Sequence, residues 1–272
     1  MIVDAQKRLI PAAVLRKANK RGCLKDIADV ENDNGNLSCG GNSMNYKCED
    51  IAKMIDHSLL RPELTEEDIR KGCEIARKYK VATVCCSPSV LALVKQLLEG
   101  YDVKATTVLG FPHGYNKTET KVFEAEQAIK DGAVELDMVI NIGKLLGRDF
   151  DYVKNDIKAV VDAAHRQDVL VKVILENCYL TDELKQIACR LAEEAGADFV
   201  KTSTGFGTGG ATLEDLQLMR KTVSEKVQVK AAGGVRDLDM AEKVREAGCT
   251  RFGATRTETI MEECYKREGK TN

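Results

Sequence analysis

The feature that most constrains the fold is a regular alternation of short apolar runs with amphipathic segments from about residue 50 onwards. The apolar runs are short and rich in β-branched residues, which is typical of buried parallel strands. They are residues 52–56, 81–86, 103–109, 133–140, 169–175, 199–203, 227–231 and 250–254. Between them, apolar residues repeat with the period of a helix, as in 122–130 and 181–195. The pattern predicts eight consecutive strand–helix units.

The boundaries of the expected helices support this interpretation. A hydroxyl residue that can cap a helix precedes acidic residues at Thr65, Thr118 and Thr181. Glycines stand where helices should end, at Gly100, Gly132, Gly196 and Gly248. Eight such units without an antiparallel signal favour a closed (β/α)8 TIM barrel. An open doubly wound sheet is the alternative, but the GxGxxG turn typical of that fold is missing after Met54 and Ile55.

The chain before the barrel differs in composition and lacks the alternation of apolar runs and amphipathic segments. We predict an N-terminal extension over residues 1–48, the barrel over 49–268 and a short tail over 269–272. Within the extension, a short helix is expected over 12–30, followed by a polar linker over 31–46 that is rich in Asn, Gly and Ser. The extension is either a regulatory or dimerising arm or a loosely attached segment.

Composition excludes several function classes. The 41 basic residues nearly balance the 43 acidic ones, giving a net charge of -2, which argues against a nucleic-acid partner. No apolar stretch is long enough to cross a membrane, and the N-terminus does not resemble a secretory signal. The sequence therefore predicts a cytoplasmic protein without a membrane partner.

The chain contains ten cysteines, which in a secreted protein would suggest disulfides. In a cytoplasmic chain we expect reduced thiols that behave as small buried apolar groups. Seven lie in or beside apolar segments: Cys73, Cys85, Cys86, Cys178, Cys189, Cys249 and Cys264. The absence of any CxxC pair and the presence of only three histidines argue against a metal site.

Four ionisable residues interrupt the apolar runs: Asp137, Lys172, Lys201 and Lys230. A charged side chain in a buried strand is costly unless it is paired. If the alternation of side chains along each strand is kept, all four face the same barrel mouth, where active sites of such barrels lie.

Lysines and an acid in this arrangement suit Schiff-base chemistry. A lysine amine is a nucleophile only when neutral, and a nearby ammonium together with desolvation lowers its pKa. A carboxylate beside it can move protons while the carbinolamine forms and dehydrates. The resulting iminium withdraws electrons, so a neighbouring carbon can lose a proton, as in an aldolase that needs no metal.

Glycine-rich segments stand at or just beyond the ends of the last three predicted strands. They are residues 202–210, residues 233–236 with Arg236, and residues 253–256. Backbone N–H groups in such turns bind phosphate, and the loops after strands seven and eight are the usual phosphate site of these barrels. The residues alone therefore predict Schiff-base chemistry on a phosphorylated carbonyl compound.

At these residues the sequence resembles the deoxyribose-phosphate aldolases, which are class I aldolases on a TIM barrel. The resemblance covers about residues 50–262 and is carried by 53–62, 135–141, 199–205 and 229–236. It implies reversible cleavage of 2-deoxy-D-ribose 5-phosphate to D-glyceraldehyde 3-phosphate and acetaldehyde, without a cofactor. It also implies that the partners are small phosphorylated sugars and aldehydes, and that a homodimer is the expected assembly.

The resemblance assigns roles to individual residues. Lys201 would form the Schiff base, Lys230 would hold the pKa of Lys201 down, and Asp137 would transfer protons through a water. Five residues match positions near the phosphate: Gly205, Gly233, Gly234, Gly253 and Thr255. From their positions in the strands, and not from the resemblance, Lys172 is expected to be a charge partner, paired with Glu135 or Asp137, rather than a second nucleophile. Cys85 is expected near the mouth as a filler or as a reactive thiol.

The sequence departs from the family pattern at two places. Arg256 follows Thr255 where a second small hydroxyl residue is common, so Arg256 either contacts phosphate or points to solvent. The chain ends without the C-terminal tyrosine that some members use to shuttle a proton, and the nearest candidate, Tyr265, is expected on the last helix.

Three other functions remain open from the residues. A metal-dependent aldolase would need clustered ligands, but His57, His113 and His165 share no strand-end pattern. His57 and His113 are instead expected to be structural. A phosphosugar isomerase would keep the phosphate loops without using Lys201 as a nucleophile, and a non-catalytic phosphosugar-binding barrel would keep the loops alone.

Overall fold

Eight parallel strands close into a barrel in the computed structural model, which describes residues 46–269. Each strand pairs with its neighbours in the sequence, and β8 pairs with β1. The strands are β1 Ile55–Leu59, β2 Thr83–Cys86, β3 Lys104–Leu109, β4 Glu135–Val139, β5 Leu170–Ile174, β6 Phe199–Lys201, β7 Gln228–Ala231 and β8 Arg251–Ala254. The predicted (β/α)8 barrel is confirmed.

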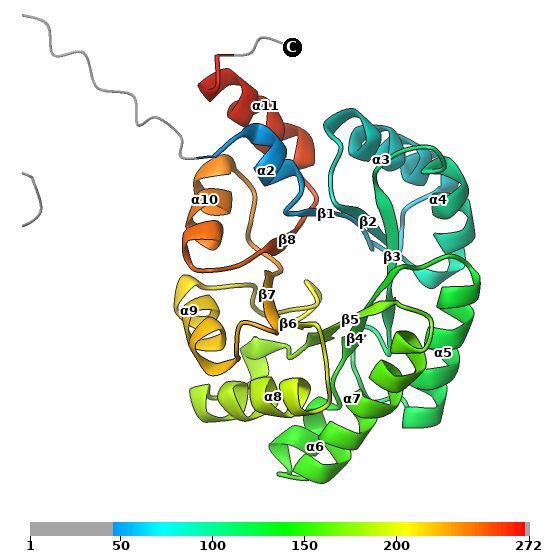
Figure 1. The fold of residues 1–272 in the computed structure, drawn as a ribbon, viewed down its shortest axis with the longest axis vertical. Helices are drawn as coiled ribbons and strands as arrows, with labels where there is room; N and C mark the ends of the chain where they lie inside the picture. The colour runs from blue at the N-terminus through cyan, green and yellow to red at the C-terminus, as the bar shows by residue number, and fades with distance from the viewer. Residues whose placement is uncertain (1–45, 270–272) are drawn as a thin grey trace, which may run out of the picture. The chain divides into compact units, whose positions relative to one another are not determined.

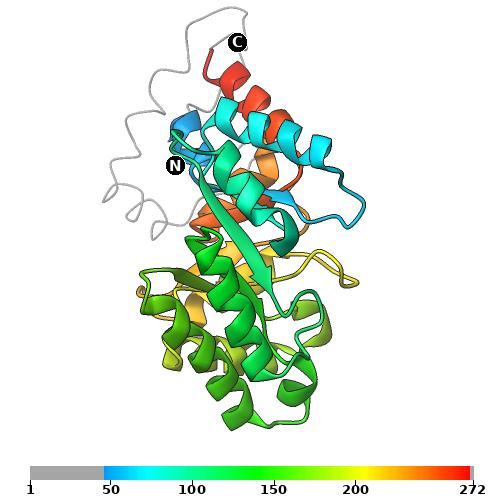
Figure 2. The same cartoon turned by 90° about the vertical axis from the view of Figure 1, so that its right-hand side faces the viewer.

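Helices surround the strands in both views of the fold (Figure 1, Figure 2). They are α2 Cys48–Ala52, α3 Glu66–Tyr79, α4 Leu91–Leu97, α5 Thr118–Lys130, α6 Ile142–Leu146, α7 Phe150–His165, α8 Asp182–Glu194, α9 Leu213–Thr222, α10 Leu238–Glu246 and α11 Thr257–Arg267, with 3-10 turns η2 Pro88–Val90 and η3 Asn177–Tyr179. The apolar side chains of strands and helices form one buried core. None of the helices in the described part of the chain is long and apolar enough to cross a bilayer.

Two of the predicted boundaries are wrong. The first strand begins at Ile55 rather than at residue 52, because residues 48–52 form α2, whose first turn carries Glu49 and Asp50. Acidic residues there favour a helix N-terminus. Thr118 is not the cap of α5 but its first residue, and its hydroxyl donates to Asp156 at 2.8 Å.

The other boundary signals agree with the structure. Thr65 and Thr181 cap α3 and α8 by accepting from the backbone N–H groups of Asp68 and Leu184. The four predicted terminating glycines all have a positive φ. The helix expected over 12–30 lies outside the described residues, as does the linker apart from Tyr46, so the domain boundaries stay predictions.

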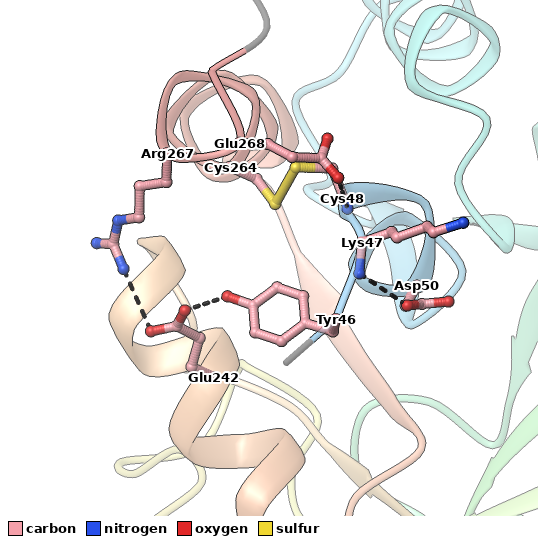
Figure 3. The surroundings of a disulfide bond; sticks show 8 residues. All are labelled: Tyr46, Lys47, Cys48, Asp50, Glu242, Cys264, Arg267 and Glu268. Atoms are coloured by element: carbon pink, nitrogen blue, oxygen red, sulfur yellow. Dashed lines mark hydrogen bonds and ion pairs between the residues drawn. A yellow bond between two sulfur atoms is a disulfide. The ribbon is translucent and has the colours of Figure 1, made fainter. Parts of the chain in front are cut away.

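A disulfide joins Cys48 in α2 to Cys264 in α11, so the prediction that Cys264 is a reduced thiol is wrong (Figure 3). The two residues are 216 positions apart, but closing the barrel brings the first helix beside the last, with the Cα atoms 5.7 Å apart. That separation suits a disulfide. The six other cysteines of the described chain are free, and five of them are buried.

Further contacts hold the start of the described chain against the barrel (Figure 3). The Tyr46 hydroxyl donates to Glu242 on α10, and Arg267 on α11 donates to the same carboxylate at 3.2 Å. The guanidinium of Arg245 lies over the Tyr46 ring, 5.1 Å from its centroid. Residues 46–48 are thus attached to α10 and α11, the last two helices of the barrel.

Candidate active site

The structure brings together the four ionisable residues of the central strands. Asp137, Lys172, Lys201 and Lys230 lie on β4, β5, β6 and β7, and each is at most 3% exposed. Asp137 Oδ1 accepts from Lys172 at 2.9 Å, and Asp137 Oδ2 accepts from Lys201 and Lys230, both at 2.7 Å. Strand register explains the convergence, because Asp137 pairs with Lys172 and Lys201 pairs with Lys230.

Three further charged residues complete this cluster, and the sequence analysis did not select them as site residues. Asp56 on β1 pairs with Lys230 and lies 2.6 Å from Arg251 Nη1. Glu135 on β4 pairs with Lys172, as one of the two predicted partnerships, and also with Arg251 at 2.9 Å. The signal that singled out the lysines also applies to Asp56 and Arg251, because both interrupt apolar strand runs.

The charges of the cluster do not cancel. Four cations, Lys172, Lys201, Lys230 and Arg251, face the three carboxylates of Asp56, Glu135 and Asp137. A buried excess of positive charge favours either the loss of a proton from one lysine or the arrival of an anionic ligand.

Lys201 is the lysine of the cluster that loses its proton most readily. Burial lowers the pKa of Lys201 and Lys230 repels its charge, which together outweigh the attraction of Asp137. Burial also acts on Lys172 and Lys230, but nearby carboxylates raise the pKa of both above the usual lysine range. Burial raises the pKa of Asp137, yet Lys172, Lys201 and Lys230 bring it well below its ordinary value, so Asp137 is a carboxylate.

Lys201 and Lys230 open into a cavity of about 420 Å³ at the ends of the strands. Every residue predicted near the phosphate lines this cavity: Gly205, Gly233, Gly234, Arg236, Gly253 and Thr255. Cys85 lines it as well. Asp137 and Lys172 do not line the cavity. Asp137 instead contacts Lys201 and Lys230, the two lysines that do. Arg256 is exposed and does not line the cavity.

The loops that follow β6 and β7 pack directly against each other. Ala211 N–H donates to the carbonyl oxygens of Ala232 and Gly233, at 3.0 and 2.9 Å. A Cβ on Gly210 would lie 2.6 Å from the Gly233 oxygen, so only glycine allows this approach. Gly233 and Gly234 have positive φ values of 76° and 103°, which leave their backbone N–H groups in a turn beside the cavity.

The sequence matches a family model described as DeoC/LacD family aldolase over residues 50–257. The chain belongs to this aldolase family. It is 54% identical to the deoxyribose-phosphate aldolase of Caldanaerobacter subterraneus subsp. tengcongensis over 220 residues, covering 80% of this chain and 95% of that one. It is 55% identical to the same-named protein of Thermococcus gammatolerans over 215 residues, covering 78% and 96%.

Solved structures agree with the family. A tetrameric deoxyribose phosphate aldolase from Aeropyrum pernix superposes with a TM-score of 0.75 at 32% identity, covering 80% of this chain and 92% of that one. An aldolase called QR15 superposes with a TM-score of 0.77 at 38% identity, covering 80% and 97%.

Three other residues singled out from the sequence, Cys85, His57 and Tyr265, show no sign of a catalytic role in this member of the aldolase family. Cys85 is 2% exposed, and burial raises the pKa of its thiol to about 11, so the thiol is protonated. Burial lowers the pKa of His57 to about 4, and this neutral ring contacts the Thr257 hydroxyl at 2.8 Å. Tyr265 lies on α11, stacked on Tyr79, and does not line the cavity.

Several residues of the cavity wall in this aldolase were not predicted from the sequence. Ser58 lies in β1 and Arg61 follows that strand, whereas Thr204 and Phe206 follow β6. His113 instead lines a second cavity with Tyr115 and Tyr179, which shares Thr204 and Phe206 with the first. These residues have no unusual charge for their position, so only the closed barrel shows that they meet.

Proposed function

We propose that this chain is a class I aldolase that reversibly cleaves 2-deoxy-D-ribose 5-phosphate to D-glyceraldehyde 3-phosphate and acetaldehyde. The observation that carries the proposal is Lys201, a buried lysine with a lowered pKa between Asp137 and Lys230, at a cavity lined by glycine-rich loops. Membership of the aldolase family and the names of the relatives support the reaction and the substrate.

The chemistry begins with the neutral amine of Lys201, which attacks carbon 1 of the open-chain sugar. The carbinolamine loses water to give an iminium. Removal of the proton from the carbon-3 hydroxyl then breaks the bond between carbons 2 and 3, and its electron pair moves toward the iminium nitrogen to form an enamine. D-glyceraldehyde 3-phosphate leaves, carbon 2 of the enamine takes a proton, and water hydrolyses the iminium to acetaldehyde and free Lys201.

Asp137 moves the protons in this scheme, through a water. Its carboxylate contacts Lys201 directly, so it can accept and return protons at the reacting nitrogen. Lys230 stays protonated and keeps Lys201 neutral by repulsion. Lys172 pairs with Asp137 and Glu135, which supports its proposed role as a charge partner.

The phosphate would lie against the glycine-rich loops. Gly205, Gly233, Gly234 and Gly253 offer backbone N–H groups, and Thr255 offers a hydroxyl. Arg236 adds a positive charge on the same wall.

The proposal includes a metal-independent reaction, a cytoplasmic location and a homodimer. Full activity in the presence of EDTA is expected, and its loss would support the metal-dependent alternative. Sedimentation tests the dimer. A phosphosugar isomerase is less well supported, because it would not need a lysine of lowered pKa beside a carboxylate.

The decisive experiment is chemical trapping. The protein is incubated with acetaldehyde and borohydride, and the modified peptide is mapped by mass spectrometry. We expect one ethyl group on Lys201, and Lys201→Met should remove it. An adduct at another lysine, or none, would overturn the mechanism.

A further inference from the structure

One buried carboxylate beside the site has no part in the chemistry above. Glu176 lies two residues beyond the end of β5 and is 2% exposed. Its backbone is in the left-handed region, with φ 57° and ψ 64°, which is unusual for a residue with a side chain. Backbone hydrogen bonds of its two neighbours place Glu176 beside the strand that carries the nucleophile. Leu175 N–H donates to the carbonyl oxygen of Lys201, and Asn177 N–H donates to the carbonyl oxygen of Thr202, both at 2.9 Å.

The side chain of Glu176 binds the loop that follows Lys201. It accepts from the backbone N–H of Thr204 at 3.1 Å and from the Thr204 hydroxyl. The same hydroxyl accepts from the backbone N–H of Phe206 at 3.0 Å. The loop also packs on the carboxylate farther along, since a Cβ on Gly207 would lie 3.1 Å from Glu176 Cδ.

These bonds fix a part of the loop that faces the catalytic cavity. Thr204, Gly205 and Phe206 all line it, and Gly205 is one of the proposed phosphate positions. The carboxylate uses both of its oxygens on the residue immediately before Gly205. The direction of the Gly205 backbone therefore depends on Glu176.

We propose that Glu176 is a positioning residue that acts through Thr204 to hold the loop in its phosphate-binding conformation. The inference rests on the proposed function. Charge and geometry make opposite predictions at this position. A carboxylate near the loops repels a phosphate, so its removal would strengthen phosphate binding if charge were all that mattered. If Glu176 positions the loop, its removal weakens phosphate binding.

The test compares Glu176→Ala with the wild type on two substrates, 2-deoxy-D-ribose 5-phosphate and unphosphorylated 2-deoxy-D-ribose. We expect KM for the phosphorylated sugar to rise about tenfold or more, the order of effect of losing a hydrogen bond to a charged group. Inorganic phosphate should inhibit correspondingly less. Activity on 2-deoxy-D-ribose and the acetaldehyde adduct at Lys201 should change less than about twofold.

Three further variants sharpen the result. Glu176→Gln keeps one acceptor oxygen and should fall between Glu176→Ala and the wild type. Thr204→Val removes the hydroxyl that links Glu176 to Phe206 and should raise KM, whereas Thr204→Ser should restore it. Glu63 is an exposed carboxylate on the cavity wall whose ion pair is with Arg61, so Glu63→Gln removes a negative charge from the wall without removing a bond to Thr204 and should lower KM or leave it unchanged.

The outcomes separate the two proposals. Equal losses on both sugars would show that Glu176 only maintains the fold, and unchanged or tighter phosphate binding would show that it does not position the loop. Either result overturns the inference while leaving the aldolase intact. A wild-type protein that forms no acetaldehyde adduct and cleaves neither sugar would overturn the proposed function itself.

Discussion

Asp137 contacts three ammonium groups at once, and this single residue determines the charge state of the candidate site. A buried ion pair contributes little net stability, but removing one partner leaves the others uncompensated. Lys172, Lys201 and Lys230 are each at most 3% exposed, so solvent screens their charges little. The stability and the chemistry of the site therefore depend on the same carboxylate.

Asp137→Asn should separate these two roles. We expect a loss of stability of about 3–5 kcal/mol, because the buried cluster loses one of its three carboxylates, although Lys172 keeps Glu135 and Lys230 keeps Asp56. The turnover number should fall by about 10²–10⁴, the usual contribution of a proton-transferring group. The acetaldehyde adduct should still form at Lys201, since its pKa falls further without the carboxylate.

Thermal melting, turnover and trapping measure these effects. Asp102→Asn serves as a control at an exposed carboxylate whose partner is Lys53, and should change none of them. Turnover close to that of the wild type would remove Asp137 from the mechanism.

Lys230→Leu tests the proposed control of the nucleophile's pKa. Without the neighbouring ammonium, the pKa of Lys201 rises, so a smaller fraction of the amine is neutral near pH 7. The deficit in activity should be largest there and should narrow as the pH approaches the ordinary lysine pKa of about 10.4. Lys230→Arg keeps the charge and should keep the shape of the wild-type profile. A pH profile of Lys230→Leu that is merely scaled down at every pH would show that Lys230 does not set the pKa of Lys201.

Much of the site could be predicted from single residues, for a physical reason. A charge inside a buried strand is so costly that function or pairing must explain it, which identified Asp137, Lys172, Lys201 and Lys230. Glu176 gave no such signal, because it follows a strand where a polar residue is ordinary. Its importance comes from a left-handed backbone and two bonds to Thr204, which only coordinates reveal.

At the scale of helices and strands, the period of the apolar residues predicted the barrel, but the contact between α2 and α11 was not predictable. Their sequence separation gives no hint that Cys48 and Cys264 meet. The pairing depends on closure, which places the helix before β1 beside the helix after β8 (Figure 3). A short apolar stretch can also start a helix or a strand, so the first strand was placed three residues too early.

Cys264→Ser should destabilise the protein by about 2–4 kcal/mol, because the disulfide no longer restricts the unfolded chain. For a chain of this size that corresponds to a melting temperature lower by about 5–15 °C. Cys178→Ser, at an exposed free cysteine, should leave the melting temperature unchanged. A Cys264→Ser variant that melts like the wild type would show that the bond contributes nothing to stability.

The disulfide also bears on the predicted cytoplasmic location, because such bonds are rare in a reducing cytosol. The test is to titrate thiols in the denatured protein, isolated from its cells under conditions that block thiol exchange. It shows whether the disulfide or the free thiols expected in the cytoplasm are present in the cell. A protein with the bond intact has at least two fewer reactive thiols than the ten cysteines of the sequence. Ten reactive thiols would show that the bond does not form in the cell.

At the scale of the whole molecule, the question is where the barrel begins. The strands, helices and cavity lie within a compact unit that starts at Met44. The boundary predicted from composition falls between residues 48 and 49, but Tyr46 and Cys48 bind α10 and α11. A barrel cut at the predicted boundary would therefore lose contacts that hold its two ends together.

Two truncations test this argument. A protein beginning at Met44 keeps Tyr46 and Cys48, so its melting temperature and aldolase activity should equal those of the full chain. A protein beginning at Glu49 loses both residues and should melt at least as far below the full chain as Cys264→Ser does. If the Met44 protein loses activity, residues 1–43 contribute to the site or its assembly. If both proteins melt alike, the contacts of Tyr46 and Cys48 do not stabilise the barrel, and the boundary predicted from composition is the correct one.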